Sequence, residues 1–132
     1  MVEVRRNSAA VLAARKAVKA AAVTLKRQEV EGGTVTIAGV PIWIDPTSQG
    51  KLTAAAVAAG LDPTMSITWK GSDGTFYDLD AAAVIALAQG AMAFVQAAFA
   101  REGALLAEIV AAETAEALAL IDITTGWPGE ET

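Results

Sequence analysis

The sequence predicts an α+β protein with two short β-hairpins, an N-terminal helix, a short middle helix and a long alanine-rich C-terminal helical region. Three observations support this class. A helix-favouring stretch without proline lies towards each end of the chain, two runs of alternating polar and apolar residues lie between them, and glycine or proline marks most of the transitions. The 132 residues are enough for one ordinary domain with a compact core.

The first predicted helix runs from about Ser8 to Gln28, within a basic N-terminal segment, residues 1–28. Apolar residues recur every seven positions along it, at Val4, Val11, Val18 and Leu25, with alanine at 14 and 21. This narrow seam fits an amphipathic helix packed on its own domain, and it also fits a helix that joins a partner or further copies of the chain. The Arg-rich, acid-poor start resembles a mitochondrial transit peptide, an interpretation that leaves the remaining chain unexplained.

Charge is divided unevenly along the chain. The net charge is −5, yet residues 1–28 hold seven of the ten Lys and Arg residues and a single acid. Phosphate contacts would be confined to one short segment, so nucleic acid is not expected as a partner. The division favours a basic helix that docks on an acidic partner or on the acidic body of the same chain. Arg15, Lys16 and Lys19 are therefore candidate partner-binding residues.

Two hairpins are predicted between the helices. In each, a short run of β-favouring residues is followed by a turn that contains glycine and by a second short run. The first hairpin comprises strand 34–37, turn 38–41 and strand 42–44, and the second comprises strand 66–70, turn 71–74 and strand 75–77. Between the hairpins, Thr47 or Ser48 is expected to cap a helix that reaches Ala59 and is ended by Gly60.

The longest predicted helix begins after the second hairpin, where Asp78 or Asp80 is expected to cap it. Its apolar positions follow one another at spacings of three and four, and the stripe continues past Gly103. The stripe consists of Val84, Ala88, Ala91, Val95, Phe99, Leu106 and Val110. Thr114 is expected to cap a last short helix that extends through Ile121, and residues 129–132 are expected to form a frayed tail.

Residues 81–100 carry no charge and are long enough to cross a membrane. Ten of them are alanine, which contributes little to partitioning, and Gln89, Gly90 and Gln96 interrupt the run. The large side chains also form a stripe, as they do in a helix that packs on one side. A buried bundle helix is therefore expected, and no membrane partner.

The residue types of most catalytic sites are missing. The sequence contains no histidine and no cysteine, which removes the usual zinc sites, thiolate nucleophiles and imidazole bases. The carboxylates of Asp73, Asp78 and Asp80 are explained by turn formation and helix capping, since the ligand spacing of a calcium loop is missing. Lys70-Gly71-Ser72 lacks the preceding glycines of a phosphate loop. No enzymatic activity is expected, and no catalytic, cofactor-binding or metal-binding residue is assigned.

The three tryptophans, Trp43, Trp69 and Trp127, are few enough to be informative. Their rings could stack on bases or sugars, but they are expected to supply the bulk that alanine cannot give to a core or an interface. Trp127 comes just before the predicted frayed end, where core packing is hardest to provide. Trp127 and Pro128 are therefore candidate partner-binding residues as well.

Several short motifs carry a resemblance when their order and spacing are taken together. They are Lys26-Arg27, Asp45-Pro46-Thr47-Ser48-Gln49, Trp69 to Phe76, Val95 to Phe99, Leu120-Ile121-Asp122 and Gly126-Trp127-Pro128. Over residues 26–128 the chain resembles a tail-associated domain of unknown function found in the tail-fibre regions of tailed phages and prophages, and its closing motifs are similar to those of tail-fibre assembly proteins. Residues 29–128 would form this phage tail-associated domain.

The resemblance implies a bacteriophage tail-fibre accessory protein. It would be a chaperone that binds the tail-fibre protein and assists its folding, trimerisation or attachment in the host cytoplasm during assembly. The alternative is a permanent structural component of the virion tail, such as a baseplate or fibre adaptor. Self-association into a homo-oligomer is a further expectation. A membrane lysis protein ranks third among the interpretations and an enzyme last.

Overall fold

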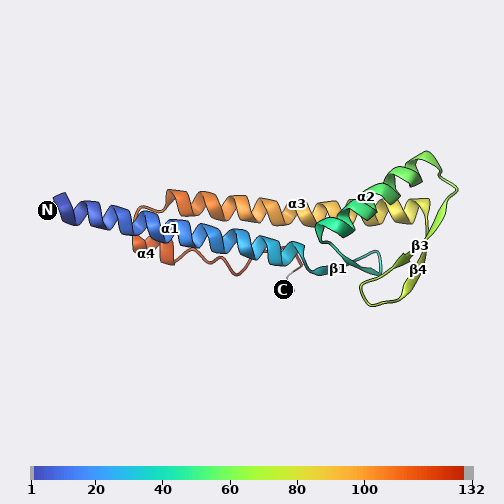
Figure 1. The fold of residues 1–132 in the computed structure, drawn as a ribbon, viewed down its shortest axis with the longest axis horizontal. Coiled ribbons are helices and arrows are strands. Elements are labelled where there is room, and N and C mark those ends of the chain that lie inside the picture. Colours follow the sequence, from blue (N-terminus) through green and yellow to red (C-terminus); the bar gives the residue numbers. More distant parts are fainter. Residues whose placement is uncertain (1, 130–132) are drawn as a thin grey trace. The chain divides into compact units, whose positions relative to one another are not determined.

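The structure is a computed structural model that describes residues 2–129, with side chains from residue 7 onwards. Helices and strands alternate along the chain (Figure 1). Their order is α1 (Val2–Glu31), β1 (Thr34–Ile37), β2 (Val40–Trp43), α2 (Pro46–Leu61), β3 (Ser66–Lys70), β4 (Phe76–Asp80), α3 (Ala81–Ala111) and α4 (Ala115–Ala119). The predicted α+β class, with its N-terminal helix, two hairpins, middle helix and long C-terminal helix, is confirmed.

The chain forms two compact units. The central unit consists of residues 29–97, and the terminal unit combines residues 1–28 with residues 98–132. The division after residue 28 coincides with the end of the predicted basic segment. The predicted domain 29–128, however, is shared between the units, because its last third packs with α1. Of the tail predicted at 129–132, residues 130–132 lie outside the described part of the chain.

The first hairpin of the central unit closes through a turn of only two residues. Ala38 and Gly39 have φ values of 51° and 81°, and Ile37 pairs with Val40 on the other side of the turn. Two positive φ angles are the signature of the tight hairpin turn whose twist matches that of the strands. The predicted turn 38–41 was therefore too long, since residues 40 and 41 already belong to β2.

The second hairpin is longer than predicted. Its register pairs Ser66 with Asp80, so β4 includes both aspartates that were expected to cap α3. Only Asp80 caps the helix, by accepting a hydrogen bond from the N–H of Ala83 at 2.8 Å. Asp78 faces Thr68 across the hairpin and accepts a bond from its hydroxyl group at 3.2 Å. The capping role predicted for Asp78 was wrong, because the strand continues to the residue before the helix.

Helix α2 begins two or three residues earlier than predicted. The carboxylate of Asp45 accepts bonds from the N–H of Ser48 at 3.4 Å and from its hydroxyl at 2.6 Å, and Pro46 occupies the first turn. Asp45, rather than Thr47 or Ser48, is thus the N-cap, and proline suits a position whose N–H would have no helical partner. Gly60 lies inside the helix, which ends at Leu61.

The core of the central unit is formed by one face of each hairpin, by α2 and by the start of α3. Its strand residues alternate, so that Ile42 and Ile44 are fully buried while Trp43 between them points outwards. The complete set of buried side chains is Val40, Ile42, Ile44, Leu52, Ala59, Leu79, Ala81, Val84, Leu87 and Ala91. Small residues let the elements approach closely: a Cβ atom added to Gly90 would lie 2.5 Å from Cγ2 of Ile37.

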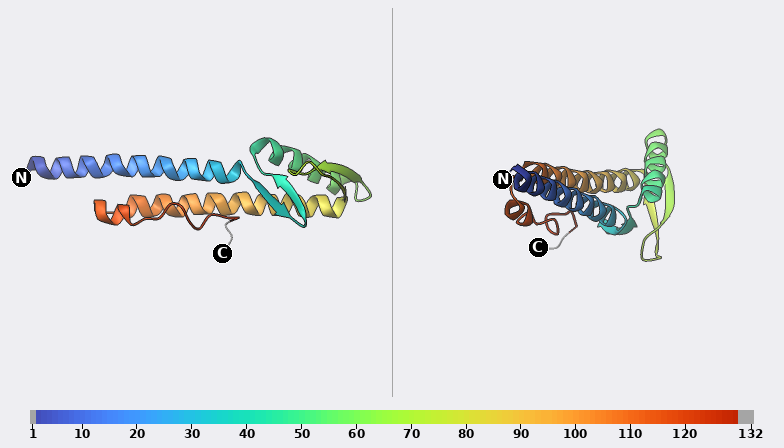
Figure 2. Two further views of the ribbon diagram at one scale, coloured as in Figure 1. Left: turned by 90° about the horizontal axis from the view of Figure 1, so that it is seen from below. Right: turned by 60° about the vertical axis from the view of Figure 1, so that its left-hand side comes forward.

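In the terminal unit, α1 runs antiparallel beside residues 98–111 of α3, with α4 and the C-terminal segment completing the packing (Figures 1 and 2). Thr114 caps α4 as predicted, accepting a bond from the N–H of Ala117 at 3.0 Å, but the helix ends at Ala119 instead of Ile121. The buried side chains are Val23, Ala98, Leu105, Ile109, Ala112, Leu118 and Trp127.

The buried side of α3 contains a seven-residue repeat, to which Leu87, Val95 and Ile109 add further buried positions. Buried residues recur at Val84, Ala91, Ala98, Leu105 and Ala112, the last just beyond the helix end. After Val95 each predicted position lies one residue beyond a buried one. The predicted Phe99 and Val110 are therefore exposed, and Leu106 is only partly buried. A spacing of seven corresponds to 3.5 residues per turn, the period of helices that stay in contact over a long distance.

Helix α3 is long and apolar enough to cross a membrane, judged by length and composition alone. Core helices of soluble proteins have the same properties. Of its most apolar stretch 28% is buried, and the buried residues of α3 belong to the cores of both units. That the chain has no membrane partner stays a prediction.

Two glycines of α3 make a matched test of the packing. Gly90→Ala should destabilise the protein by about 1–3 kcal/mol, because the new methyl group must displace the branched side chain of Ile37. Gly103→Ala meets no atom within 4 Å and should stabilise it by about 0.5–1 kcal/mol through helix propensity. Urea unfolding of both variants measures the difference, and equal effects would contradict the close approach at Gly90.

Candidate functional site

Two of the predicted partner-binding residues make contacts inside the terminal unit. The ammonium group of Lys16 donates to the carbonyl of Val110 at 2.9 Å, and that of Lys19 donates to the carbonyl of Leu118 at 2.6 Å. Both carbonyls lie in the last turn of a helix, where backbone acceptors lack helical partners and the helix dipole favours a positive charge. The basic helix therefore docks on the body of its own chain, one of the two arrangements that the charge division favours.

A third basic residue of α1 extends this inner face. The Nε atom of Arg27 lies 3.2 Å from Oε1 of Glu102, and its guanidinium group is 4.7 Å from the centre of the Phe99 ring. The sequence analysis did not single out this cluster. A signal was present, because α3 carries only two acids, Glu102 and Glu108, that could pair with a basic helix, but sequence spacing alone cannot match residues 75 positions apart.

Trp127 is a packing residue of the terminal unit. Its side chain is only 3% exposed, and its indole N–H donates to the carbonyl of Ile123 at 2.9 Å. Pro128, the neighbouring candidate, is partly buried. A partner-binding role for the two residues stays a prediction, but such a role would require this segment to move away from its own core.

Arg101 holds the C-terminal segment in place. Its guanidinium group donates to the carbonyls of Thr125 at 3.0 Å and Asp122 at 3.4 Å. The guanidinium group also passes close to Gly126, where a Cβ atom would lie 2.7 Å from Nε and where φ is 83°. Glycine is therefore needed at this position for both space and backbone conformation.

Asp122 stabilises the turn that leads to Trp127. Its carboxylate accepts bonds from the hydroxyl group and the N–H of Thr124 at 2.6 Å and 2.8 Å, and from the hydroxyl of Thr125 at 3.1 Å. These bonds, the Thr124 hydroxyl foremost, lower the pKa of Asp122 below its ordinary value of 3.8.

The opposite side of α1 presents an apolar face that the unit leaves uncovered. Val11, Val18 and Leu25 are all exposed, Val18 to 72% and Leu25 to 58%. We call this surface, together with Ala14 and Ala21, the outer face of α1. Arg15 borders it, and Arg15 and Val18 line the same shallow apolar hollow. From Val11 to Leu25 the heptad seam predicted from the sequence is thus exposed, and Val4, its first predicted position, lies outside the residues whose side chains are described. The inner face carries Lys16, Lys19 and Val23.

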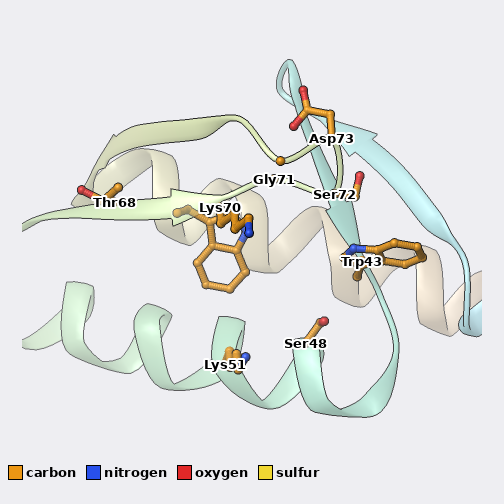
Figure 3. Close-up of a pocket in the computed structure, with 10 residues that line it drawn as sticks. Trp43, Ser48, Lys51, Thr68, Lys70, Gly71, Ser72 and Asp73 are labelled. Carbon is orange, nitrogen blue, oxygen red and sulfur yellow. The ribbon is translucent and has the colours of Figure 1, made fainter.

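The central unit contains a hollow of about 660 Å³ between α2 and the second hairpin. Figure 3 shows Ser48 and Lys51 on α2, across the hollow from the tip of the second hairpin, with Trp43 of β2 beside them. The residues with functional groups are Trp43, Lys51, Trp69, Lys70, Ser72 and Asp73. We call this surface the tryptophan hollow. It brings together two of the three tryptophans, which are 26 positions apart.

The hairpin tip beside the hollow is rigidly built. The N–H of Ser72 donates to the carbonyl of Pro41 at 2.9 Å, which ties the two hairpins together. Asp73 accepts bonds from the N–H of Thr75 and the hydroxyl of Tyr77, both at 3.0 Å, and the first of these is the main cause of a lowered pKa at Asp73. Gly71 is buried, with no room for a Cβ atom between Asp73, Tyr77 and Pro41.

The carboxylates have structural partners instead of a shared site. Among the residues that the structure describes, no group of three or more His, Cys, Asp or Glu side chains is placed to hold a metal ion. Asp45, Asp62, Asp73, Asp80 and Asp122 each accept a backbone N–H at a helix start or a turn. The outer face of α1 and the tryptophan hollow offer apolar side chains, aromatic rings and charged groups for binding a partner or ligand.

A comparison with protein families gives one match. The family model described as "Domain of unknown function (DUF4376)" matches residues 13–125. Neither the curated proteins nor the solved structures include a significant match to the chain.

The burial of Trp127 predicts a large loss of stability on its removal. Trp127→Ala should destabilise the terminal unit by about 3–5 kcal/mol, because it leaves a cavity and an unpaired carbonyl at Ile123. Trp43→Ala, which removes a half-exposed ring, should cost far less. Urea unfolding followed by circular dichroism measures both. Equal losses in the two variants would show that Trp127 is not part of a core.

Acid should loosen the C-terminal turn through Asp122. Since the folded-state pKa lies below the unfolded value, the stabilisation by this carboxylate is complete above the unfolded value and is lost as the pH falls through the folded pKa. Wild type should therefore lose more stability than Asp122→Asn between about pH 5 and pH 3, because the variant has no charge at this position to lose. Unfolding at both pH values tests this, and parallel losses would rule out a contribution from Asp122.

Proposed function

Because the chain belongs to the family described as Domain of unknown function (DUF4376), a description that states no activity, we propose its function from its surface and from its resemblance to tail-fibre region products. It is a bacteriophage tail-fibre accessory protein, a chaperone that binds the fibre protein during assembly in the host cytoplasm. The observation that carries this proposal is the outer face of α1.

The outer face has the properties of a protein-binding surface. Its large residues, Val11, Val18 and Leu25, recur every seven positions, so they form one straight apolar line along the helix. Such a line fits between the side chains of a partner helix with the same period. Several apolar side chains gathered on one exposed face are more than the isolated exposed residue that any soluble protein tolerates.

The inner contacts of α1 make this face available. Lys16 and Lys19 bond to carbonyls of α3 and α4, and Arg27 pairs with Glu102, so the helix is held against its unit by the side that carries the basic residues. A helix that is already folded and fixed loses less entropy on binding than a free segment. Arg15 lies beside the outer face and is available to steer an acidic partner, whereas Lys19, which lines the same hollow, donates to the carbonyl of Leu118.

An assembling fibre provides a surface of the matching kind. Before its chains have trimerised, a fibre protein exposes apolar side chains and unpaired strand edges, which aggregate readily. A small folded protein with an exposed apolar helix face can cover such a surface until the trimer closes. Covering an apolar surface requires no catalytic residue, and the sequence analysis assigns none.

The experiment is co-expression with the neighbouring fibre gene, measuring the yield of soluble trimer. Val18→Lys with Leu25→Lys should reduce co-purification and trimer yield at least tenfold, because each charge would be buried in the interface. The matched control is Val110→Lys, which changes an exposed apolar residue of the same unit outside the outer face. Arg15→Glu should slow association without preventing it.

The outcomes separate the alternatives. Equal trimer yields with and without the chain would remove the chaperone proposal. Presence in purified particles at a fixed ratio to the fibre would favour a permanent structural component of the tail. If the wild-type chain alone forms an oligomer that the Val18→Lys, Leu25→Lys variant does not form, the occupant of the outer face is a second copy of the chain.

A further inference from the structure

The tryptophan hollow exposes aromatic surface that the fold itself does not need. Trp43 is 50% exposed although the residues on either side of it, Ile42 and Ile44, are fully buried. Trp69 is partly buried and packs against the core of the central unit, so one indole is anchored and the other stands free beside it. Indole rings offer flat apolar faces together with an N–H donor, a combination that suits ligands with both apolar and polar surfaces.

The side chains that line the hollow carry a net positive charge, opposite in sign to the net charge of the protein. Lys51 and Lys70 contribute two positive charges and Asp73 one negative charge, which gives +1 in a protein of net charge −5. Within the described part of the chain, neither ammonium group has a carboxylate partner, and Lys70 lies 5.8 Å from the centre of the Phe76 ring. Two unpaired cations beside one cavity favour an anionic ligand.

Polar groups of the lining can bond to hydroxyl groups. The hydroxyl of Ser48 donates to Asp45 at 2.6 Å, which leaves its lone pairs free to accept. Ser72 lines the hollow from the opposite side, at the tip of the second hairpin (Figure 3). The carboxylate of Asp73 uses two of its acceptor positions on Thr75 and Tyr77 and retains others, and a charged carboxylate is a strong acceptor for sugar hydroxyls.

We propose that the tryptophan hollow binds an acidic saccharide, with a sugar ring stacked on Trp43, its carboxylate at Lys51 and Lys70, and hydroxyl groups at Ser48 and Asp73. The volume of about 660 Å³ accommodates one or two sugar residues. A polynucleotide also stacks on indoles, but it carries a phosphate at every residue, and the single excess positive charge of the hollow suits a ligand of sparser charge.

The site is prepared for its ligand before binding. The bond from Ser72 to Pro41 fixes the hairpin tip, and the cap formed by Asp45 fixes the start of α2 that carries Ser48 and Lys51. Little backbone order has to be gained on binding, which favours affinity for a small ligand. This inference is independent of the proposed docking through α1, since every residue of the hollow belongs to the central unit.

The test is titration of the full chain with a galactose trimer in which one residue is galacturonic acid, so that it carries a single carboxylate, and with the neutral galactose trimer, followed by calorimetry and tryptophan fluorescence. The acidic trimer should bind at least tenfold more tightly, and its affinity should fall as salt is added. Trp43→Ala and Lys51→Gln should each weaken it about tenfold, and Trp43→Phe should retain part of the affinity because a ring remains. Leu61→Ala, an exposed position on α2 outside the hollow, is the control and should bind as wild type.

Three results would overturn the inference. The first is no binding of the acidic trimer at millimolar concentration by a chain whose circular dichroism shows that it is folded. The second is binding that Trp43→Ala and Lys51→Gln leave unchanged. The third is equal or tighter binding of a thymidine trinucleotide, which would assign the hollow to nucleic acid instead.

Discussion

The buried seven-residue repeat of α3 is the constraint on which both units depend. Its first positions supply Val84 and Ala91 to the central core, and its later positions supply Ala98 and Leu105 to the terminal core. A period of 3.5 keeps the buried side on one line along the whole helix, whereas spacings that drift by one residue would turn it away from its neighbours. Alanine at many of these positions removes bulk, so that adjacent elements approach closely.

In helix α1, charged and apolar side chains lie on the opposite sides from those usual in an amphipathic helix. Its apolar heptad line is exposed, while lysines occupy the side that faces the unit. The reason is chemical: the ends of α3 and α4 present carbonyl groups without helical partners, and the long side chains of Lys16 and Lys19 reach them with their ammonium groups. With the helix held by these contacts, the apolar line from Val11 to Leu25 stays exposed. The proposed docking function follows from this inversion.

The tryptophan hollow depends on strand alternation and on a hydrogen bond between the two hairpins. Strand alternation places Ile42 and Ile44 in the core, which forces Trp43 outwards, and the tie between Ser72 and Pro41 brings the tip of the second hairpin to the same place. Lys51 arrives from α2, whose first turn is fixed by Asp45. Three elements separated in the sequence thus form one surface with stacking, charge and hydrogen-bonding groups.

Local features were determined by the sequence alone. The strands 34–37 and 66–70, the cap at Thr114 and the α+β class follow from alternation, turn residues and capping chemistry, which act over a few positions. The sequence also indicated that Asp78 or Asp80 would cap α3, and the cap is Asp80. Where neighbouring motifs compete, as Asp45 does with Ser48 for the start of α2, local rules give the element but not its first residue.

The tertiary structure alone decided which faces are buried and which residues meet. A heptad line such as that of Val11, Val18 and Leu25 identifies an amphipathic helix, but whether it is covered depends on what the opposite side bonds to. The burial of Trp127 depends likewise on the return of the C-terminal segment, which Arg101 holds from another helix. The meeting of Trp43 with Lys51 and Lys70 depends on hairpin and helix packing, since contacts between distant residues are set by the whole fold and not by local spacing.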